Sequence, residues 1–213
     1  MCFKHGHGGR VHKAGGEFRG GVGVLVADKI VAIRGERWVF GPISFRIAAG
    51  GVMLLVGPNG SGKSTLLRIL AGLGRIEAGQ VLWNGEDAMA DRAGHGERVA
   101  YLGHQDAVKP GLTALENLGA NAGLGLAAVG LANLADQPVR FFSAGQKRRL
   151  ALARLAVRAA PIWLLDEPTL GLDATSVARF GVMLAEHRAA GGMVIAATHL
   201  PLPMDDVAEL RLA

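Results

Sequence analysis

The sequence predicts an α/β fold built on a parallel, doubly wound core sheet. Three short apolar segments, at 52–56, 161–168 and 193–199, are typical of strands that are buried on both faces. Apolar residues at helical spacing follow the first segment and separate the second from the third. Because strand–helix–strand alternation places successive strands parallel to one another, these segments are expected to form one sheet.

The composition indicates one packed domain. The 213 residues are 50% hydrophobic and 19% charged, which is enough for a well-buried α/β domain. The formal net charge of +5 fits attraction to phosphates or to an anionic membrane face, but a general bias of the composition toward Gly, Ala and Arg is the preferred explanation. Cys2 is the single cysteine, so an internal disulfide is excluded and a reducing compartment is favoured.

The chain divides into an extension and a domain. Residues 1–26 are interpreted as a flexible, Gly-rich extension, since "GVGVLVA" (21–27) is too short and too rich in glycine for the core of a signal peptide. The folded domain is expected over 27–213. Near its start, small antiparallel strands are predicted at 29–33 and 43–47. A turn and an edge strand are expected between them, and further strands are predicted at 80–85 and 98–103.

A segment without charged residues spans 117–135, which is about the length of a membrane-spanning helix. It consists mostly of Ala and Gly, and three asparagines are spaced through it. We therefore interpret it as part of a small helical subdomain at about 106–158 rather than as a membrane span.

"GPNGSGKST" (57–65) matches the pattern G-x-x-x-x-G-K-[ST] between a buried strand and a helix. Its glycines allow the backbone to curl so that successive N–H groups form an anion-binding nest, which the helix dipole reinforces. Lys63 supplies a mobile positive charge for phosphates, and the Ser64 hydroxyl can ligate Mg²⁺. The predicted phosphate-binding residues are Gly57, Pro58, Asn59, Gly60, Ser61, Gly62, Lys63, Ser64 and Thr65.

Two acidic residues end the second apolar segment. In "IWLLDEP", Asp166 stands where phosphate-loop proteins hold Mg²⁺ through an acid at the end of a neighbouring strand. Glu167 follows directly, and a carboxylate there can orient or deprotonate an attacking water. In isolation the pair could be a helix cap before a proline. The phosphate loop upstream favours the catalytic interpretation.

Five motifs together resemble those of the ATP-binding cassette (ABC) ATPases. In chain order they are "GPNGSGKST", "GHQ" at 103–105, "FFSAGQKRR" at 141–149, "IWLLDEPTLGLD" at 162–173 and "ATH" at 197–199. The resemblance covers roughly residues 27–200 and implies a P-loop NTPase fold of the ABC type. It also implies ATP and Mg²⁺ as cofactors, with hydrolysis at the interface of a head-to-tail homodimer.

The resemblance implies further roles. Gln105 is similar to the residue that touches Mg²⁺ or the attacking water and senses the transport partner. His199 resembles the switch histidine that contacts the γ-phosphate, and Asp173 corresponds to the D-loop at the dimer interface. Arg34 stands where many relatives carry an aromatic residue that stacks on adenine. A guanidinium can stack there too, with Trp38 as an alternative.

"SAGQ" resembles the signature motif, which faces the γ-phosphate bound to the other subunit. Ser143, Gly145 and Gln146 would then form a second anion cup at a helix N-terminus, where no ionisable group is needed. Read alone, the same residues would be an ordinary helix cap. Two departures from the family are visible: Ala144 replaces the more frequent glycine, and the segment from Gln105 to Ser143 is short.

Within the ABC ATPases, the chain resembles the family of ATP-binding subunits of the cytochrome c biogenesis heme exporter. The stretches that carry this finer resemblance are "RGERWVF", "YLGHQDAVKPGLTALENL", "SAGQKRRLALARL" and "ATHLPLP". It implies a bacterial ATPase on the cytoplasmic face of the inner membrane, bound peripherally to an integral permease subunit of the heme exporter B type. Hydrolysis would drive heme delivery or release of a heme chaperone, together with other cytochrome c maturation proteins and without nucleic acid.

Three alternatives stay open on the sequence. The chain could energise another ABC transporter, which would have the same ATP site. It could be a soluble ABC ATPase of DNA repair or translation, although such proteins usually insert long coiled coils or join two cassettes. It could also bind nucleotide without hydrolysing it, but the presence of Lys63, Asp166, Glu167 and His199 argues against an inactive subunit.

Overall fold

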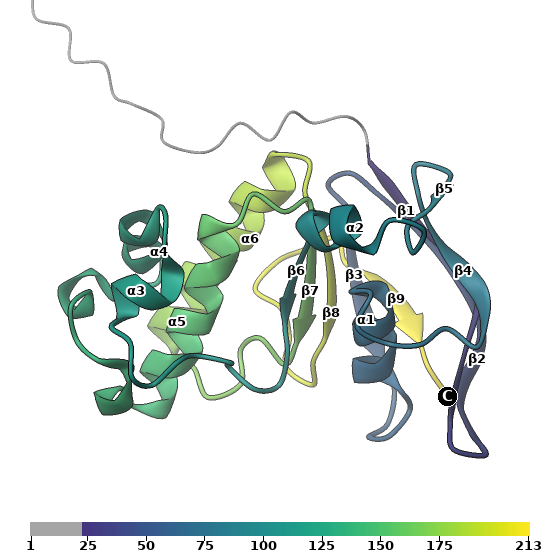
Figure 1. The fold of residues 1–213 in the computed structure, drawn as a ribbon, viewed down its shortest axis with the longest axis horizontal. Helices are drawn as coiled ribbons and strands as arrows, with labels where there is room; N and C mark the ends of the chain where they lie inside the picture. Colours follow the sequence, from purple (N-terminus) through teal and green to yellow (C-terminus); the bar gives the residue numbers. More distant parts are fainter. Residues whose placement is uncertain (1–22) are drawn as a thin grey trace, which may run out of the picture.

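The computed structural model describes residues 23–213 and contains two sheets (Figure 1). A parallel sheet has the strand order β6-β7-β8-β3-β9, and an antiparallel sheet has the order β2-β1-β4-β5. The parallel strands are β3 (Val52–Val56), β6 (Val99–Leu102), β7 (Ile162–Asp166), β8 (Met193–Ala197) and β9 (Ala208–Arg211). The antiparallel strands are β1 (Val24–Arg34), β2 (Arg37–Ala48), β4 (Ala78–Trp83) and β5 (Glu86–Asp87).

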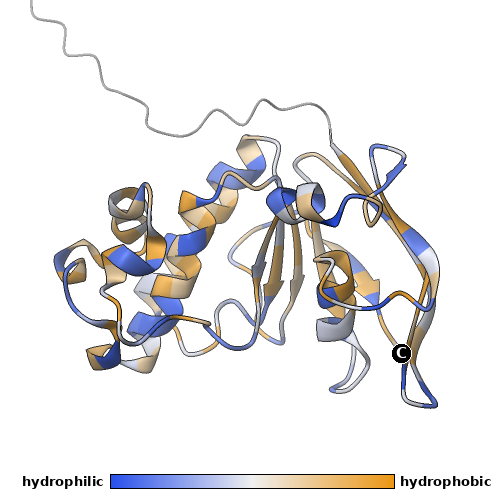
Figure 2. Ribbon diagram, in the orientation of Figure 1, coloured by the Kyte–Doolittle hydropathy of each residue, from blue (hydrophilic) through white to orange (hydrophobic). Residues whose placement is uncertain are grey.

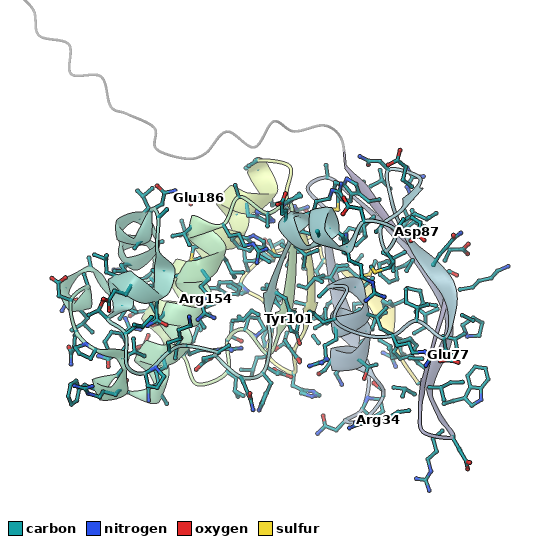
Figure 3. The ribbon with its side chains drawn as sticks, in the orientation of Figure 1. Arg34, Glu77, Asp87, Tyr101, Arg154 and Glu186 are labelled. Atoms are coloured by element: carbon teal, nitrogen blue, oxygen red, sulfur yellow. The ribbon has the colours of Figure 1, made fainter. Side chains whose placement is uncertain are left out.

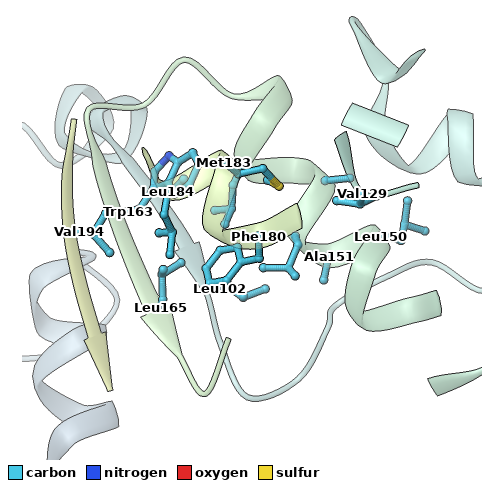
Figure 4. Close-up of a cluster of buried hydrophobic side chains, with 14 of the residues drawn as sticks. Leu102, Val129, Leu150, Ala151, Trp163, Leu165, Phe180, Met183, Leu184 and Val194 are labelled. Atoms are coloured by element: carbon cyan, nitrogen blue, oxygen red, sulfur yellow. The ribbon is translucent and has the colours of Figure 1, made fainter. Parts of the chain in front are cut away.

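Both faces of the parallel sheet are covered, which explains its uninterrupted apolar segments. In β7, Ile162 and Leu164 face a core formed with α1 and the antiparallel sheet. Trp163 and Leu165 face a second core formed with the helices on the other side (Figure 4). Side chains alternate along a strand, so a strand between two cores must be apolar at every position. Figure 2 shows these central strands in hydrophobic colours.

Helices occupy the two sides of the sheet. Helix α1 lies between the two sheets, and α5 and α6 cover the opposite face of the parallel sheet, with α3 and α4 packed outside α5 (Figure 1). The helices are α1 (Lys63–Leu70), α2 (Arg92–Arg98), α3 (Ala114–Leu118), α4 (Ala122–Ala128), α5 (Ala144–Val157) and α6 (Ala174–Ala189). Two short 3-10 turns, η1 (Ala132–Leu134) and η2 (Val139–Phe141), complete the helical region.

The structure corrects one boundary and adds three elements. Strand β1 begins at Val24, and Leu25 is fully buried, so the expected end of the flexible extension at residue 26 is wrong. The rest of that extension, residues 1–22 with Cys2, lies outside the described residues. Elements α2, β5 and β9 were not predicted, because β5 is very short and neither α2 nor β9 presents a clear apolar face.

The uncharged segment at 117–135 forms the end of α3, the short helix α4 and the turn η1. Helix α4 packs on α3 and α5, as a small helical subdomain requires. Within residues 23–213, no helix combines the length and the apolarity that crossing a membrane would need.

Candidate active site

The loop between β3 and α1 curls tightly and requires glycine. Gly62 has φ 92°, and an added Cβ would lie 2.5 Å from Phe40 Cδ1. A Cβ on Gly57 would collide with the carbonyl oxygen of Leu212, beside β9. Because the loop leads directly into the first turn of α1, its amides stand at the positive end of the helix dipole. The loop therefore has the tight turn before a helix N-terminus that the motif predicts.

Lys63 lies over this loop. Its Nζ donates hydrogen bonds to the carbonyl oxygens of Gly57 at 2.7 Å and of Pro58 at 2.9 Å. Only 9% of the residue is exposed. These carbonyls hold the ammonium group at the loop, where it would meet an anion bound to the nest.

Most of the predicted residues line one cleft of about 770 Å³. It extends from the phosphate loop to the β1–β2 turn and to the ends of β7 and β8. The predicted residues that line it are Arg34, Asn59, Gly60, Gly62, Lys63, Ser64, Thr65, Asp166, Glu167 and His199. Gly57, Pro58 and Ser61 belong to the loop without lining the cleft.

Sequence reasoning missed several residues of this cleft. Arg37, Val39, His104, Leu170 and Leu200 also line it. Only the proximity of each to a recognised motif could have indicated them. Trp38, named as an alternative to Arg34, is 65% exposed in the cleft. Figure 3 shows Arg34 at the same end of the molecule as the loop before α1.

Glu167 and His199 meet beyond the C-terminal ends of the parallel strands β7 and β8. The backbone amide of His199 donates to Glu167 Oε2 at 3.3 Å, and His199 Nε2 lies 3.7 Å from Glu167 Oε1. Nε2 is also 2.9 Å from Asn59 Oδ1 of the phosphate loop. Strands β7 and β8 are adjacent and parallel, so the segments that follow them start side by side. This explains how residues 32 positions apart come together.

The three residues predicted to bind magnesium, Ser64, Gln105 and Asp166, line two clefts that share part of their walls. Ser64 and Asp166 line the 770 Å³ cleft, and Asp166 is only 5% exposed. Gln105 does not line that cleft but a second one of about 690 Å³, which shares Ser64, His104 and Asp166 with the first. Hydroxyl, carboxylate and amide oxygens are the ligands that Mg²⁺ takes alongside phosphate oxygens. Over residues 23–213, no cluster of three His, Cys, Asp or Glu residues forms an all-protein metal site.

Two pKa shifts describe the electrostatics near Asp166 and at Asp173. Burial raises the pKa of Tyr101, and the negative charge of Asp166 raises it further. At the head of α6, the backbone amide of Ser176 donates to Asp173 at 2.7 Å and lowers the pKa of this carboxyl group. Asp166 and Asp173 thus present negative charge in different places, one inside the cleft and one at a helix cap.

The signature residues lie apart from the cleft of the described chain. Ser143 and Gln146 form a reciprocal capping box at the start of α5, with Gln146 N donating to Ser143 Oγ at 3.2 Å and Ser143 N donating to Gln146 Oε1 at 2.8 Å. A Cβ on Gly145 would lie 3.5 Å from the carbonyl of Gly171, close to the loop that carries Asp173. None of these residues lines the 770 Å³ cleft. Figure 1 shows α5 and α1 in different parts of the molecule.

A glycine loop between β3 and α1, a lysine over it and an acidic pair at the end of β7, with β8 between β3 and β7 in the sheet, are typical of P-loop nucleotide-binding ATPases. Residues 40–170 match the ABC transporter family. A relative from Paramagnetospirillum magneticum, the cytochrome c biogenesis ATP-binding export protein CcmA, is 47% identical over 200 residues, covering 87% of this chain and 92% of the relative. The protein of the same name from Rhodospirillum rubrum is 47% identical over 199 residues, covering 89% and 85%.

Solved structures support the fold. The chain is similar to an ATP-binding cassette of an ABC transporter in its ADP conformation, with a TM-score of 0.75, 20% identity and coverage of 90% of this chain and 89% of that one. It is also similar to cbiO1 from Clostridium perfringens, with a TM-score of 0.74, 24% identity and coverage of 89% and 86%.

The family match and the two relatives at 47% identity show that the chain belongs to the CcmA family of ABC transporter ATPases.

Proposed function

We propose that the chain is the ATP-hydrolysing subunit of a heme exporter in cytochrome c maturation. The observation that carries the proposal is the meeting of Lys63, Glu167 and His199 in one cleft beside the phosphate loop. The names of the relatives supply the biological context, since they are described as cytochrome c biogenesis ATP-binding export proteins.

In the proposed mechanism, the loop amides and Lys63 bind the β and γ phosphates of ATP. Ser64, Asp166 and Gln105 would hold Mg²⁺, which neutralises charge on the phosphate oxygens when bound. When ATP binds, Lys63 Nζ would release its hydrogen bonds to the loop carbonyls and donate to phosphate oxygens instead. The loop amides and Lys63 would then already point toward the phosphates, so they would stabilise the negative charge of the transition state without rearranging during the reaction.

Glu167 would orient the attacking water and accept its proton. His199 is suited to contact the γ-phosphate, since its ring already lies 2.9 Å from Asn59 of the phosphate loop and 3.7 Å from Glu167. The amide of His199 would keep the carboxylate of Glu167 turned toward this point, because it donates to Oε2.

The adenine ring would lie near the β1–β2 turn, against Trp38 or Arg34. Trp38 is an exposed aromatic ring on the cleft, so it offers a larger stacking surface than a guanidinium. A loss of ATP affinity in Trp38→Ala, with wild-type affinity in Arg34→Ala, would identify Trp38 as the adenine contact. The opposite pattern would assign that contact to Arg34.

The proposed active unit is a head-to-tail homodimer. Ser143, Gly145 and Gln146 lie outside the chain's own cleft, so they would contact the triphosphate bound to the partner subunit, with Asp173 at the interface. We further propose an integral membrane permease of the heme exporter B type and other cytochrome c maturation proteins as partners. This arrangement would keep the ATPase peripheral, on the cytoplasmic face of the bacterial inner membrane.

The test is complementation of a bacterium that lacks its own heme-exporter ATPase. The full chain should restore covalent heme in c-type cytochromes and should co-purify with a membrane permease. Lys63→Ala should lose both ATP binding and complementation while it is still produced and folded. Normal cytochrome maturation with Lys63→Ala would contradict the proposal, as would ATP hydrolysis by the wild-type chain without any complementation.

A further inference from the structure

We infer that Arg148 of α5 is a positioning residue that fixes the backbone of Glu167 and links it to the loop of Gln105. The inference concerns how the hydrolysis site is held, and it rests on the role proposed above for Glu167. Arg148 is 6% exposed and lies five residues after Ser143 in the sequence. A buried arginine needs several hydrogen-bond partners.

The first set of partners surrounds Glu167. Arg148 NH2 donates to the carbonyl oxygen of Asp166 at 2.9 Å and also to the carbonyl oxygen of Glu167. These carbonyls belong to the two peptide planes on either side of the Cα of Glu167. The φ and ψ angles of Glu167 describe how these two planes are rotated about its Cα. These angles set the direction in which the side chain leaves the backbone. One guanidinium nitrogen therefore restrains the direction in which the carboxylate leaves the backbone.

Glu167 needs such a restraint because its backbone is in an unfavourable conformation. It has φ 48°, in the left-handed region, which costs a residue with a Cβ roughly 1–2 kcal/mol. Its amide donates to the carbonyl of Ala197 at 2.8 Å, which fixes one side of the residue to β8. The bond from Arg148 to the carbonyl oxygen of Glu167 holds the other side. Strain of this kind persists only where the surroundings determine the conformation.

The second set of partners holds the segment that contains Gln105. Arg148 NH1 donates to the carbonyl of Gly103 at 3.1 Å and to Asp106 Oδ1 at 3.0 Å. Arg154, one to two turns further along α5, donates to the carbonyls of Asp106 and Ala107. Figure 3 shows Arg154 on α5 and Tyr101 on β6, and both line the 690 Å³ cleft that contains Gln105.

Arg148 is the residue that joins both sets. Its two terminal nitrogens connect the Gln105 segment, helix α5 and the backbone of Glu167 through one rigid, planar group. A displacement of α5 or of the Gln105 segment would therefore change the direction of the Glu167 carboxylate. A lysine could not reproduce this link, because its single nitrogen cannot span carbonyls on opposite sides of the guanidinium.

The test uses the full chain in its membrane complex, with Arg148→Lys and Arg148→Met compared with wild type. We expect kcat to fall about tenfold or more, because a misdirected base is costly, whereas ATP affinity stays within about twofold. Arg188→Lys is the matched control, since the Arg188 guanidinium also donates to two backbone carbonyls, those of Gly50 at 2.8 Å and Asp205 at 3.1 Å, and lines neither cleft. This control should retain the wild-type kcat. An unchanged kcat in both Arg148 variants, or a parallel loss of ATP affinity, would overturn the inference.

A double-variant measurement separates positioning from general loosening of the fold. In a Glu167→Gln background, Arg148→Lys should lower the residual kcat no further, because both changes act through the same carboxylate. Losses that multiply would overturn the inference.

A crystal structure of Arg148→Met supplies a readout that does not require activity. Glu167 should leave φ 48° or turn its carboxylate away from the amide of His199. Retention of both features would contradict the inference even if the wild-type chain proved inactive, whereas failure of the proposed function would appear as an inactive wild type with intact geometry at Arg148.

Discussion

His199 Nε2 lies 2.9 Å from Asn59 Oδ1, although 140 positions separate the two residues in the sequence. The contact joins the end of β8 to the phosphate loop that follows β3. Strands β3 and β8 are parallel neighbours, so the segments after their C-terminal ends meet at one edge of the sheet. This edge is where the γ-phosphate would lie, between the loop and the Glu167–His199 pair.

Glu167→Gln should leave only a small residual turnover while ATP binding persists. The amide retains the shape of the carboxylate, and its oxygen can still accept the hydrogen bond from the amide of His199, but it cannot accept a proton from water. We expect phosphate release to fall on the order of 100-fold or more, with ATP-bound dimers accumulating in size-exclusion chromatography. Phosphate release at the wild-type rate would refute the role assigned to Glu167.

Gly145→Asp should prevent the ATP-dependent dimer without affecting ATP binding to one subunit. The carboxylate would face the phosphates of the partner's nucleotide and repel them. Gly145→Ala is the matched control, because its Cβ would make only an ordinary contact at 3.5 Å with the carbonyl of Gly171. Light scattering with ATP should show dimers for Gly145→Ala and monomers for Gly145→Asp. Dimers of Gly145→Asp would show that the signature residues do not face a phosphate.

Gly62→Ala should damage the phosphate loop more than Gly60→Ala. Both residues have positive φ, 92° and 85°, so each substitution carries a backbone cost of about 1 kcal/mol. Only at Gly62 would the new Cβ also collide with Phe40, whereas the space around Gly60 is open. Thermal unfolding and ATP titration should therefore show the larger loss for Gly62→Ala. Equal losses would mean that the contact with Phe40 relaxes without cost.

His187 should make the fold less stable in mild acid. Burial lowers its pKa from 6.5 to about 4, although its hydrogen bond to the carbonyl of Met193 opposes that shift. The ring stacks on Trp163 with centroids 3.9 Å apart. Because the folded protein favours the neutral ring, this stability is present above pH 6.5 and is lost as the pH falls toward 4.

This loss amounts to about 2 kcal/mol between pH 7 and pH 5. Urea unfolding at the two pH values should show it for the wild type. His187→Phe should reduce the pH dependence by that amount, because phenylalanine can stack on Trp163 but cannot be protonated. The same pH dependence in both proteins would assign the acid sensitivity to other groups.

The parallel sheet and the glycine-rich loop between β3 and α1 were predictable because their signals are local. Residues 52–56 were predicted as a strand, and β3 occupies that range. The motif at 57–65 fixes the positions of the glycines and the lysine within the loop. Glycine is required where the backbone approaches its neighbours closely. By contrast, the small strand β9 carries no apolar run, and its place at the sheet edge follows from pairing with β3.

The sequence by itself determined the class of the fold, the phosphate loop and the acidic pair, because each depends on neighbouring residues and on the periodicity of a single element. Tertiary structure alone decided that Trp38 would share the cleft with Arg34, and that Gln105 would line the adjacent cleft. It alone also placed Arg148 against the backbone of Glu167. These relationships join segments distant in sequence, and only the packing of helices on the sheet fixes the distances between them.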